Sequence, residues 1–105
     1  MRINSFEEII EHSLAFVNDD FTELWVICDK IYDTNPEIKY LELIETTKTI
    51  LRELIEKHNV CLLNETTLKP MILSVDETLK LVENHLLKLN KAPNIGDGIW
   101  LTIKE

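Results

Sequence analysis

Three histidines, two cysteines and 19 acidic side chains are the residues that could do chemistry in this chain, and their spacing builds no complete catalytic set. Glu8 and His12 lie four positions apart, which would place two ligands on one helix face. A zinc site needs more ligands than these two, so a surface ion pair is the simpler interpretation. Cys28 lies between Ile27 and Ile31 in an apolar stretch, as a small core residue does. We therefore predict no enzyme activity, no metal and no cofactor.

The chain carries no nucleotide-binding or hydrolytic motif. Its two glycines, Gly96 and Gly98, precede no expected helix, and the patterns HExxH, CxxC and GxSxG are missing. Scattered lysines surround an expected helix over residues 74–89, which contains no arginine; these lysines are Lys69, Lys80, Lys88 and Lys91. Such an arrangement reads DNA bases poorly. We expect no direct nucleic-acid contact and no small-molecule ligand.

Negative charge is concentrated in the first part of the chain. The formal net charge is −8, and residues 1–45 hold 11 acidic and 3 basic residues, whereas residues 46–105 hold 8 of each. Phosphate binding needs positive potential, so this asymmetry also disfavours nucleic acid. A negative surface would steer a basic protein partner toward the chain. The alternative is a solvated acidic surface that only aids solubility.

Two helices are expected before residue 34. Ser5 and Glu8 form a capping-box pattern that opens the first helix, which should end near Asn18. Asp19 or Asp20 would cap the second helix. Its expected buried stripe consists of Phe21, Leu24, Trp25, Cys28, Ile31 and Tyr32. The very short connection predicts that the two helices pack antiparallel.

A third helix, a strand, a fourth helix and a second strand should follow. Asn35-Pro36 is a start signal for a long helix that runs to about His58. Residues 60–63 and 99–103 are apolar runs typical of strands, and we expect them to pair. Between these two strands, Ser74 and Glu77 form a capping box at the start of a fourth helix. The prediction is one domain over residues 1–105, of mostly helical α+β class. It has three N-terminal helices, then strand–helix–strand with a small antiparallel two-stranded sheet.

Several segments together resemble a known family. They are the stretch from Phe21 to Asn64, with Leu24-Trp25 before Asp29-Lys30-Ile31-Tyr32, then Ser74 opening a helix, and Gly96-Asp97-Gly98-Ile99-Trp100. These segments, about two thirds of the chain, resemble small acidic bacterial immunity proteins of contact-dependent growth inhibition and related polymorphic toxin systems, although the motifs carry fold better than function. The resemblance implies a protein that binds and neutralises one cognate toxin domain, which in many such systems is a basic nuclease.

Location and partner surface complete the expectations. No apolar run reaches the length of a membrane span, the start of the chain is amphipathic, and the two cysteines are isolated, so we expect a cytoplasmic protein without membrane contact. The expected partner-binding residues are Glu7, Glu8, Glu11, Asp19, Asp20, Glu23, Asp29 and Asp33. The alternative function is a small regulatory or adaptor protein-binding module of winged-helix-like shape, which would use the helix after Ser74 and the strand pair.

Overall fold

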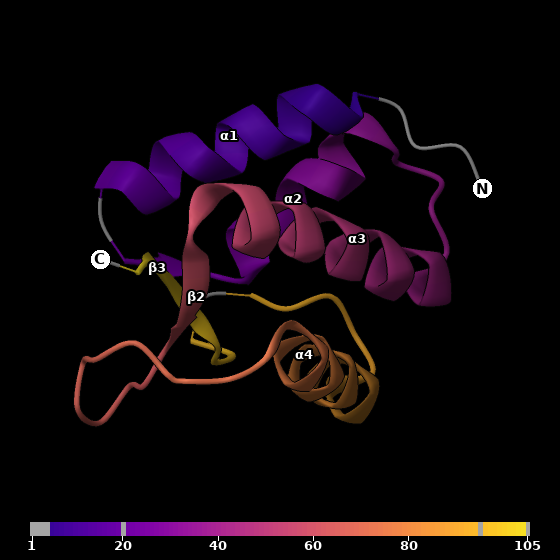
Figure 1. The fold of residues 1–105 in the computed structure, drawn as a ribbon. Helices are drawn as coiled ribbons and strands as arrows, with labels where there is room; N and C mark the ends of the chain where they lie inside the picture. Colours follow the sequence, from indigo (N-terminus) through magenta and orange to yellow (C-terminus); the bar gives the residue numbers. More distant parts are fainter. Residues whose placement is uncertain (1–4, 20, 95, 105) are drawn as a thin grey trace.

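Four helices and three short strands make up the described part of the chain in the computed structural model, which covers residues 5–19, 21–94 and 96–104 (Figure 1). In chain order they are α1 (Phe6–Asp19), β1 (Thr22–Glu23), α2 (Trp25–Thr34), α3 (Tyr40–His58), β2 (Val60–Leu63), α4 (Val75–Leu89) and β3 (Trp100–Ile103). The mostly helical α+β class is therefore confirmed, but the sheet has three strands rather than two.

Strand β3 lies in the middle of the sheet, antiparallel to both of its neighbours. Val60 pairs with Ile103 and Leu63 pairs with Trp100, so the predicted pairing of these two strands is confirmed. The outer side of β2 is partly covered, because the Met71 N–H donates a hydrogen bond of 2.8 Å to the Leu62 carbonyl.

Strand β1 occupies the segment that was predicted to open the second helix, and that prediction is wrong. Thr22 pairs with Leu101, and the Leu24 N–H donates to the Ile99 carbonyl at 3.0 Å. The apolar residues here do have helical spacing, but pairing with a strand distant in sequence gives the backbone better partners. Helix α2 therefore begins only at Trp25.

Helix starts and ends also differ from the prediction at Asn35. This residue ends α2 instead of starting α3: its backbone N–H donates to the Ile31 carbonyl at 2.8 Å, and its side-chain amide donates to the same oxygen at 3.3 Å. Helix α3 begins later, at Tyr40, where Glu42 accepts a hydrogen bond of 3.1 Å from the Lys39 N–H. Its predicted end near His58 is confirmed.

The two predicted capping boxes have different outcomes. At α4, the Glu77 N–H donates to the Ser74 hydroxyl at 3.1 Å, and the Ser74 N–H donates to the Glu77 carboxylate at 2.9 Å, as predicted. At α1, Ser5 has φ +61°, whereas a capping residue is extended. Its carbonyl accepts the Ile9 N–H instead. Asp19 belongs to the last turn of α1, and Asp20 lies outside the described residues.

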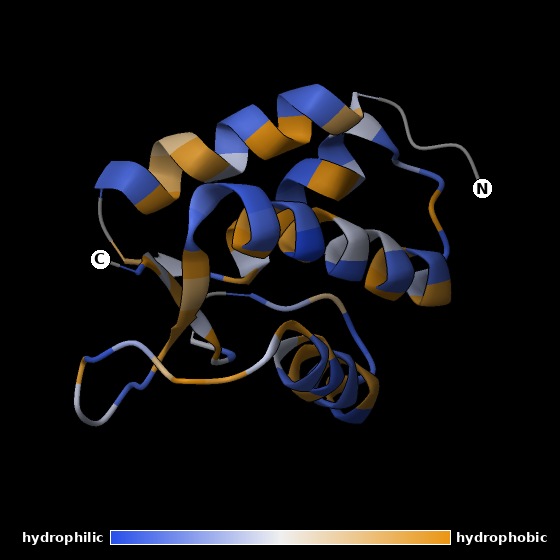
Figure 2. Ribbon diagram, viewed as in Figure 1, coloured by the Kyte–Doolittle hydropathy of each residue, from blue (hydrophilic) through white to orange (hydrophobic). Residues whose placement is uncertain are grey.

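Helix α3 lies at the centre of the packing, where it contacts α1, α2 and α4. Figure 2 shows hydrophobic segments at intervals along α1, α3 and α4, as expected of helices with one buried face. The most completely buried side chains are Ile9, Leu24, Ile27, Ile31, Leu43, Ile50, Leu51, Leu54, Leu86, Leu101, Val60 and Val82. Three members of the expected buried stripe of the second helix are not buried, since Phe21 is 44% exposed and both Trp25 and Tyr32 are only half-buried.

Side-chain contacts tie α4 to α3 near the end and near the middle of α4. The Tyr40 hydroxyl lies 2.5 Å from the Leu86 carbonyl and 2.8 Å from the Lys91 carbonyl, so it can donate to either of these at the end of α4. Lys48 lies 2.9 Å from Glu83 on α4. These links hold α4 along α3 in one orientation.

Candidate partner-binding surfaces

Carboxylates of α1 and α2 form one acidic surface. Glu7, Glu8 and Glu11 are exposed on α1 because Ile9 and Ile10 take the buried side of the helix. Asp29 and Asp33 are exposed on α2. We call these five carboxylates the acidic face.

Lys30 joins the two helices within the acidic face. Its Nζ lies 3.2 Å from Oε2 of Glu8 and 3.7 Å from Oδ2 of Asp33. The packing therefore brings carboxylates of α1 and α2 together, as the sequence predicted. Glu7 lies near the end of α3, where its charge raises the pKa of Lys57, although the hydrogen bond from Lys57 to Glu53 is the larger cause.

Two of the predicted partner-binding residues, Glu23 and Asp19, lie outside the acidic face. Glu23 is 8% exposed on β1, and its Oε2 accepts a hydrogen bond of 3.0 Å from the Gly96 N–H, so its predicted exposure is wrong. The reason is that residues 22–23 pair with β3, and this pairing places Glu23 beside the loop that contains Gly96. Asp19 is exposed at the end of α1, and Asp20 is not among the described residues.

The nucleophilic side chains lie where their chemistry is suppressed. Burial raises the pKa of the Cys28 thiol to about 11, and the hydrogen bond with Thr47, at 3.6 Å, lowers it only in part. Burial also raises the pKa of Cys61. His12 stacks in a tilted contact on Phe16, with ring centroids 4.9 Å apart. Over the described ranges, His, Cys, Asp and Glu side chains form no group of three or more that could hold a metal ion.

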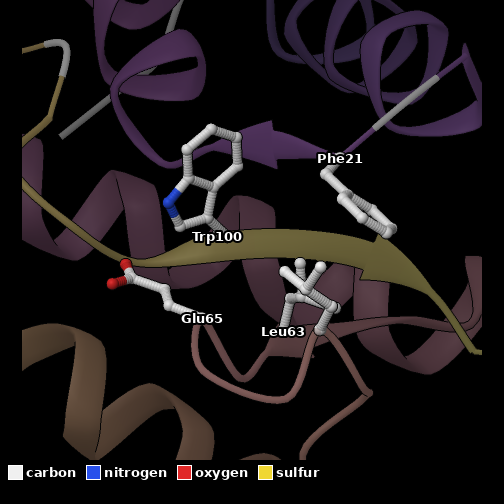
Figure 3. A pocket seen from close by; sticks show the side chains of 5 residues that line it. Phe21, Leu63, Glu65 and Trp100 are labelled. Carbon is white, nitrogen blue, oxygen red and sulfur yellow. The ribbon is translucent and has the colours of Figure 1, made fainter.

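An apolar hollow at one end of the sheet is a second surface, which sequence reasoning missed. Figure 3 shows side chains from β2, β3 and the neighbouring loops gathered around it. The hollow measures about 230 Å³ and is lined by Phe21, Leu63, Glu65, Leu68 and Trp100. A neighbouring hollow of about 300 Å³ shares Leu63, Glu65 and Trp100 and extends to Leu81 on α4. We call the two hollows together the sheet-end groove.

Bulky apolar side chains are exposed in the sheet-end groove, and others are exposed elsewhere on the described surface, at Phe16, Leu41, Ile72 and Leu87. Phe21 is 44% exposed, Leu68 60% and Leu81 37%. A signal was present in the sequence, because Leu68 is an apolar residue inside an otherwise polar loop. It was not recognised, because the residues that line the same hollow include Phe21 and Trp100, which are distant in the chain.

Lys48 and Arg52 of α3 form ion pairs rather than an open positive surface. Lys48 contacts Glu45 at 3.5 Å in addition to Glu83 on α4. Arg52 contacts Glu56 at 3.3 Å and Asp76 at 3.5 Å. These pairs neutralise the charges that a phosphate backbone would need.

No protein-family model, curated protein or solved structure matches this chain. Of the helices in the part of the chain that the structure describes, none has the length and apolar content needed to cross a membrane.

Proposed function

We propose that this chain is an immunity protein that binds a basic cognate toxin domain through the acidic face and thereby blocks it. The observation that supports the proposal is the set of five exposed carboxylates on two adjacent helices, with Lys30 as the basic residue between them. Such a surface raises the rate at which a positively charged partner associates, and desolvated pairs at its centre add affinity. A cytoplasmic location is part of this proposal.

Binding rather than catalysis is proposed because the reactive side chains are poorly placed for chemistry. A thiol with the raised pKa of Cys28 stays protonated at neutral pH, and the thiolate is the nucleophilic form. The carboxylates of the acidic face are exposed, whereas general acids and bases usually need a desolvated cleft.

The experiment compares two triple variants that remove equal charge. Glu7→Gln, Glu11→Gln and Asp29→Asn together alter the acidic face, while Glu37→Gln, Glu45→Gln and Glu56→Gln alter exposed carboxylates elsewhere. The probe is the product of the gene directly upstream, which the proposal expects to encode a toxin domain. We expect the first variant to bind at least about tenfold more weakly, mainly through slower association, and to protect cells less.

Salt provides an independent measurement. Raising the ionic strength from about 50 to about 300 mM should slow association of the natural chain and of the control variant, because it shortens the Debye length. The acidic-face variant should respond less. Equal affinities of the two triple variants at both salt concentrations would overturn the proposal, as would the absence of any binding to the neighbouring gene product.

A second function is favoured by the third strand. The order α1, β1, α2, α3, β2, β3, with β3 central in the sheet, is that of a winged-helix domain in which α4 lies between β2 and β3. In a DNA reader of the helix-turn-helix type the second helix of the pair enters the major groove, which here would be α3. Because α4 packs along α3, and Lys48 and Arg52 of α3 are ion-paired, we propose as the alternative an adaptor that binds proteins through α4 and the strand pair.

A further inference from the structure

The sheet-end groove consists of two hollows separated by one wall. Leu63, Glu65 and Trp100 line both hollows, so the apolar surface continues from Phe21 on one side to Leu81 on the other. An apolar surface of this kind, hollowed and rimmed by polar residues, is typical of a site that receives a partner's side chains.

The exposed apolar side chain of Leu68 is not required by the fold. It has φ +58° and is 60% exposed, at the tip of a turn in which its N–H donates to the Asn64 carbonyl at 2.8 Å. The Asn64 side chain also accepts the Thr66 and Thr67 N–H groups, so the turn is well defined. Glycine or asparagine adopts this left-handed backbone at lower cost than leucine does. A leucine here sacrifices stability for a side chain that lines the groove.

Charge identifies the partner's chemistry. Among the described residues that line the two hollows, Glu65 is the one with a formal charge, and it is exposed. Within the described chain Glu65 forms no ion pair, so its carboxylate is open to a cation. A second copy of this chain is a poor occupant, because each copy carries a net charge of −8 and would add a second acidic surface.

We propose that the sheet-end groove binds a segment of a partner protein that carries two bulky apolar side chains and a lysine or arginine beside them. One apolar side chain enters the hollow between Phe21 and Trp100, the other enters the hollow between Trp100 and Leu81, and the cation meets Glu65. This inference rests on the adaptor function, the second of the two functions above, and does not involve the acidic face.

The test uses a library of random peptides displayed on phage and selected on the purified full chain. Enriched peptides should share two large apolar residues and one lysine or arginine. Synthetic versions of these peptides should bind the Leu68→Asn variant and the Leu81→Gln variant at least about tenfold more weakly than the natural chain. Such a loss is typical of central apolar contacts. The melting temperature of Leu68→Asn should equal or exceed that of the natural chain, because asparagine tolerates the left-handed backbone.

Charge exchange tests the role of Glu65. Glu65→Lys should weaken the binding of the enriched peptides about tenfold. Replacing the peptide's lysine or arginine by glutamate should restore binding to this variant. Glu37→Lys is the matched control, because Glu37 is exposed but lies outside the groove, and it should have little effect.

The outcomes separate this inference from the adaptor function. Peptides that depend on Leu68 and Leu81 but carry no cation would overturn the inference and leave docking at the groove standing. Enrichment of no peptide, or of peptides insensitive to both substitutions, would overturn the docking surface itself. Concentration-dependent dimerisation that Leu68→Asn abolishes would show that a second copy is the occupant, and would also overturn the inference.

Discussion

The acidic face and the sheet-end groove relate differently to the stability of the fold. Carboxylates of the acidic face project from helices whose buried sides are made by other residues, such as Ile9 and Ile27. The groove instead uses Leu63 and Trp100, which are paired residues of the sheet itself. A charged helix surface can therefore change in evolution almost independently of stability, whereas changes in the groove must also preserve the sheet.

The largest expected effect separates two adjacent residues of β3. Side chains alternate across a strand, and Leu101 is fully buried while Trp100 lines the groove. Leu101→Ala should lower the free energy of unfolding by about 2–5 kcal/mol, as expected for a buried leucine. Trp100→Ala should cost clearly less. Chemical denaturation of both variants measures this difference, and equal losses would mean that the groove wall is part of the core.

A smaller effect on the free energy of unfolding should distinguish Glu23 from Asp29, which were both predicted to bind the partner. Glu23→Ala removes the carboxylate that accepts the Gly96 N–H and should cost about 1.5–3 kcal/mol, the usual contribution of a hydrogen bond to a charged group. Asp29→Ala changes an exposed side chain and should stay within about 0.5 kcal/mol. Denaturant titration provides the measurement. A loss of similar size in Asp29→Ala would show that the acidic face is coupled to the fold.

Acid should weaken the α4 side of the molecule through two glutamates. Hydrogen bonding from Lys48 lowers the pKa of Glu83, and hydrogen bonds from Ser74 lower the pKa of Glu77. Because these pKa values are lower in the folded state, the stabilisation is present above the ordinary glutamate pKa of about 4.3 and is lost as the pH falls through the folded values. Unfolding measured across this range should show a weaker acid dependence in Glu83→Gln. An unchanged dependence would mean that the Lys48 contact does not persist in solution.

Thiol labelling of the natural chain should distinguish Cys28 from Cys61 without any substitution. Cys28 lies on the buried side of α2 and is 1% exposed, whereas Cys61 is partly exposed on β2. In the folded chain at about pH 8, iodoacetamide should modify Cys61 first and Cys28 only as the protein unfolds, because the pKa of Cys28 is raised further above this pH. Mass spectrometry of timed samples measures the order. Faster modification of Cys28 would contradict the packing of α2.

Local signals in the sequence identified the elements whose structure depends on neighbouring residues. The capping box at Ser74 and the apolar strands around Leu62 and Leu101 were predicted correctly because these patterns act over a few residues. Asn35 was misassigned because asparagine is favoured at both ends of helices, and only the surrounding packing decides which end it occupies.

The structural features that were not predicted from the sequence depend on contacts between segments that are distant in the chain. Strand β1 has two residues and no periodicity of its own, so its existence follows from its pairing with β3. Glu23 became buried for the same reason, and the groove brings together Phe21, Leu63 and Trp100, which are distant in the chain. Exposed carboxylates on α1 and α2 were easier to place, because helical spacing alone separates them from the buried side.

The central position of β3 also determines when the fold can be completed during synthesis. Residues 100–103 leave the ribosome after both of the strands that they join, so β1 and β2 remain without their shared partner until β3 has emerged. Loop-closure entropy over such a sequence separation slows the final step of folding. During that interval the chain exposes strand edges and apolar residues, and it is then most vulnerable to aggregation and most dependent on chaperones.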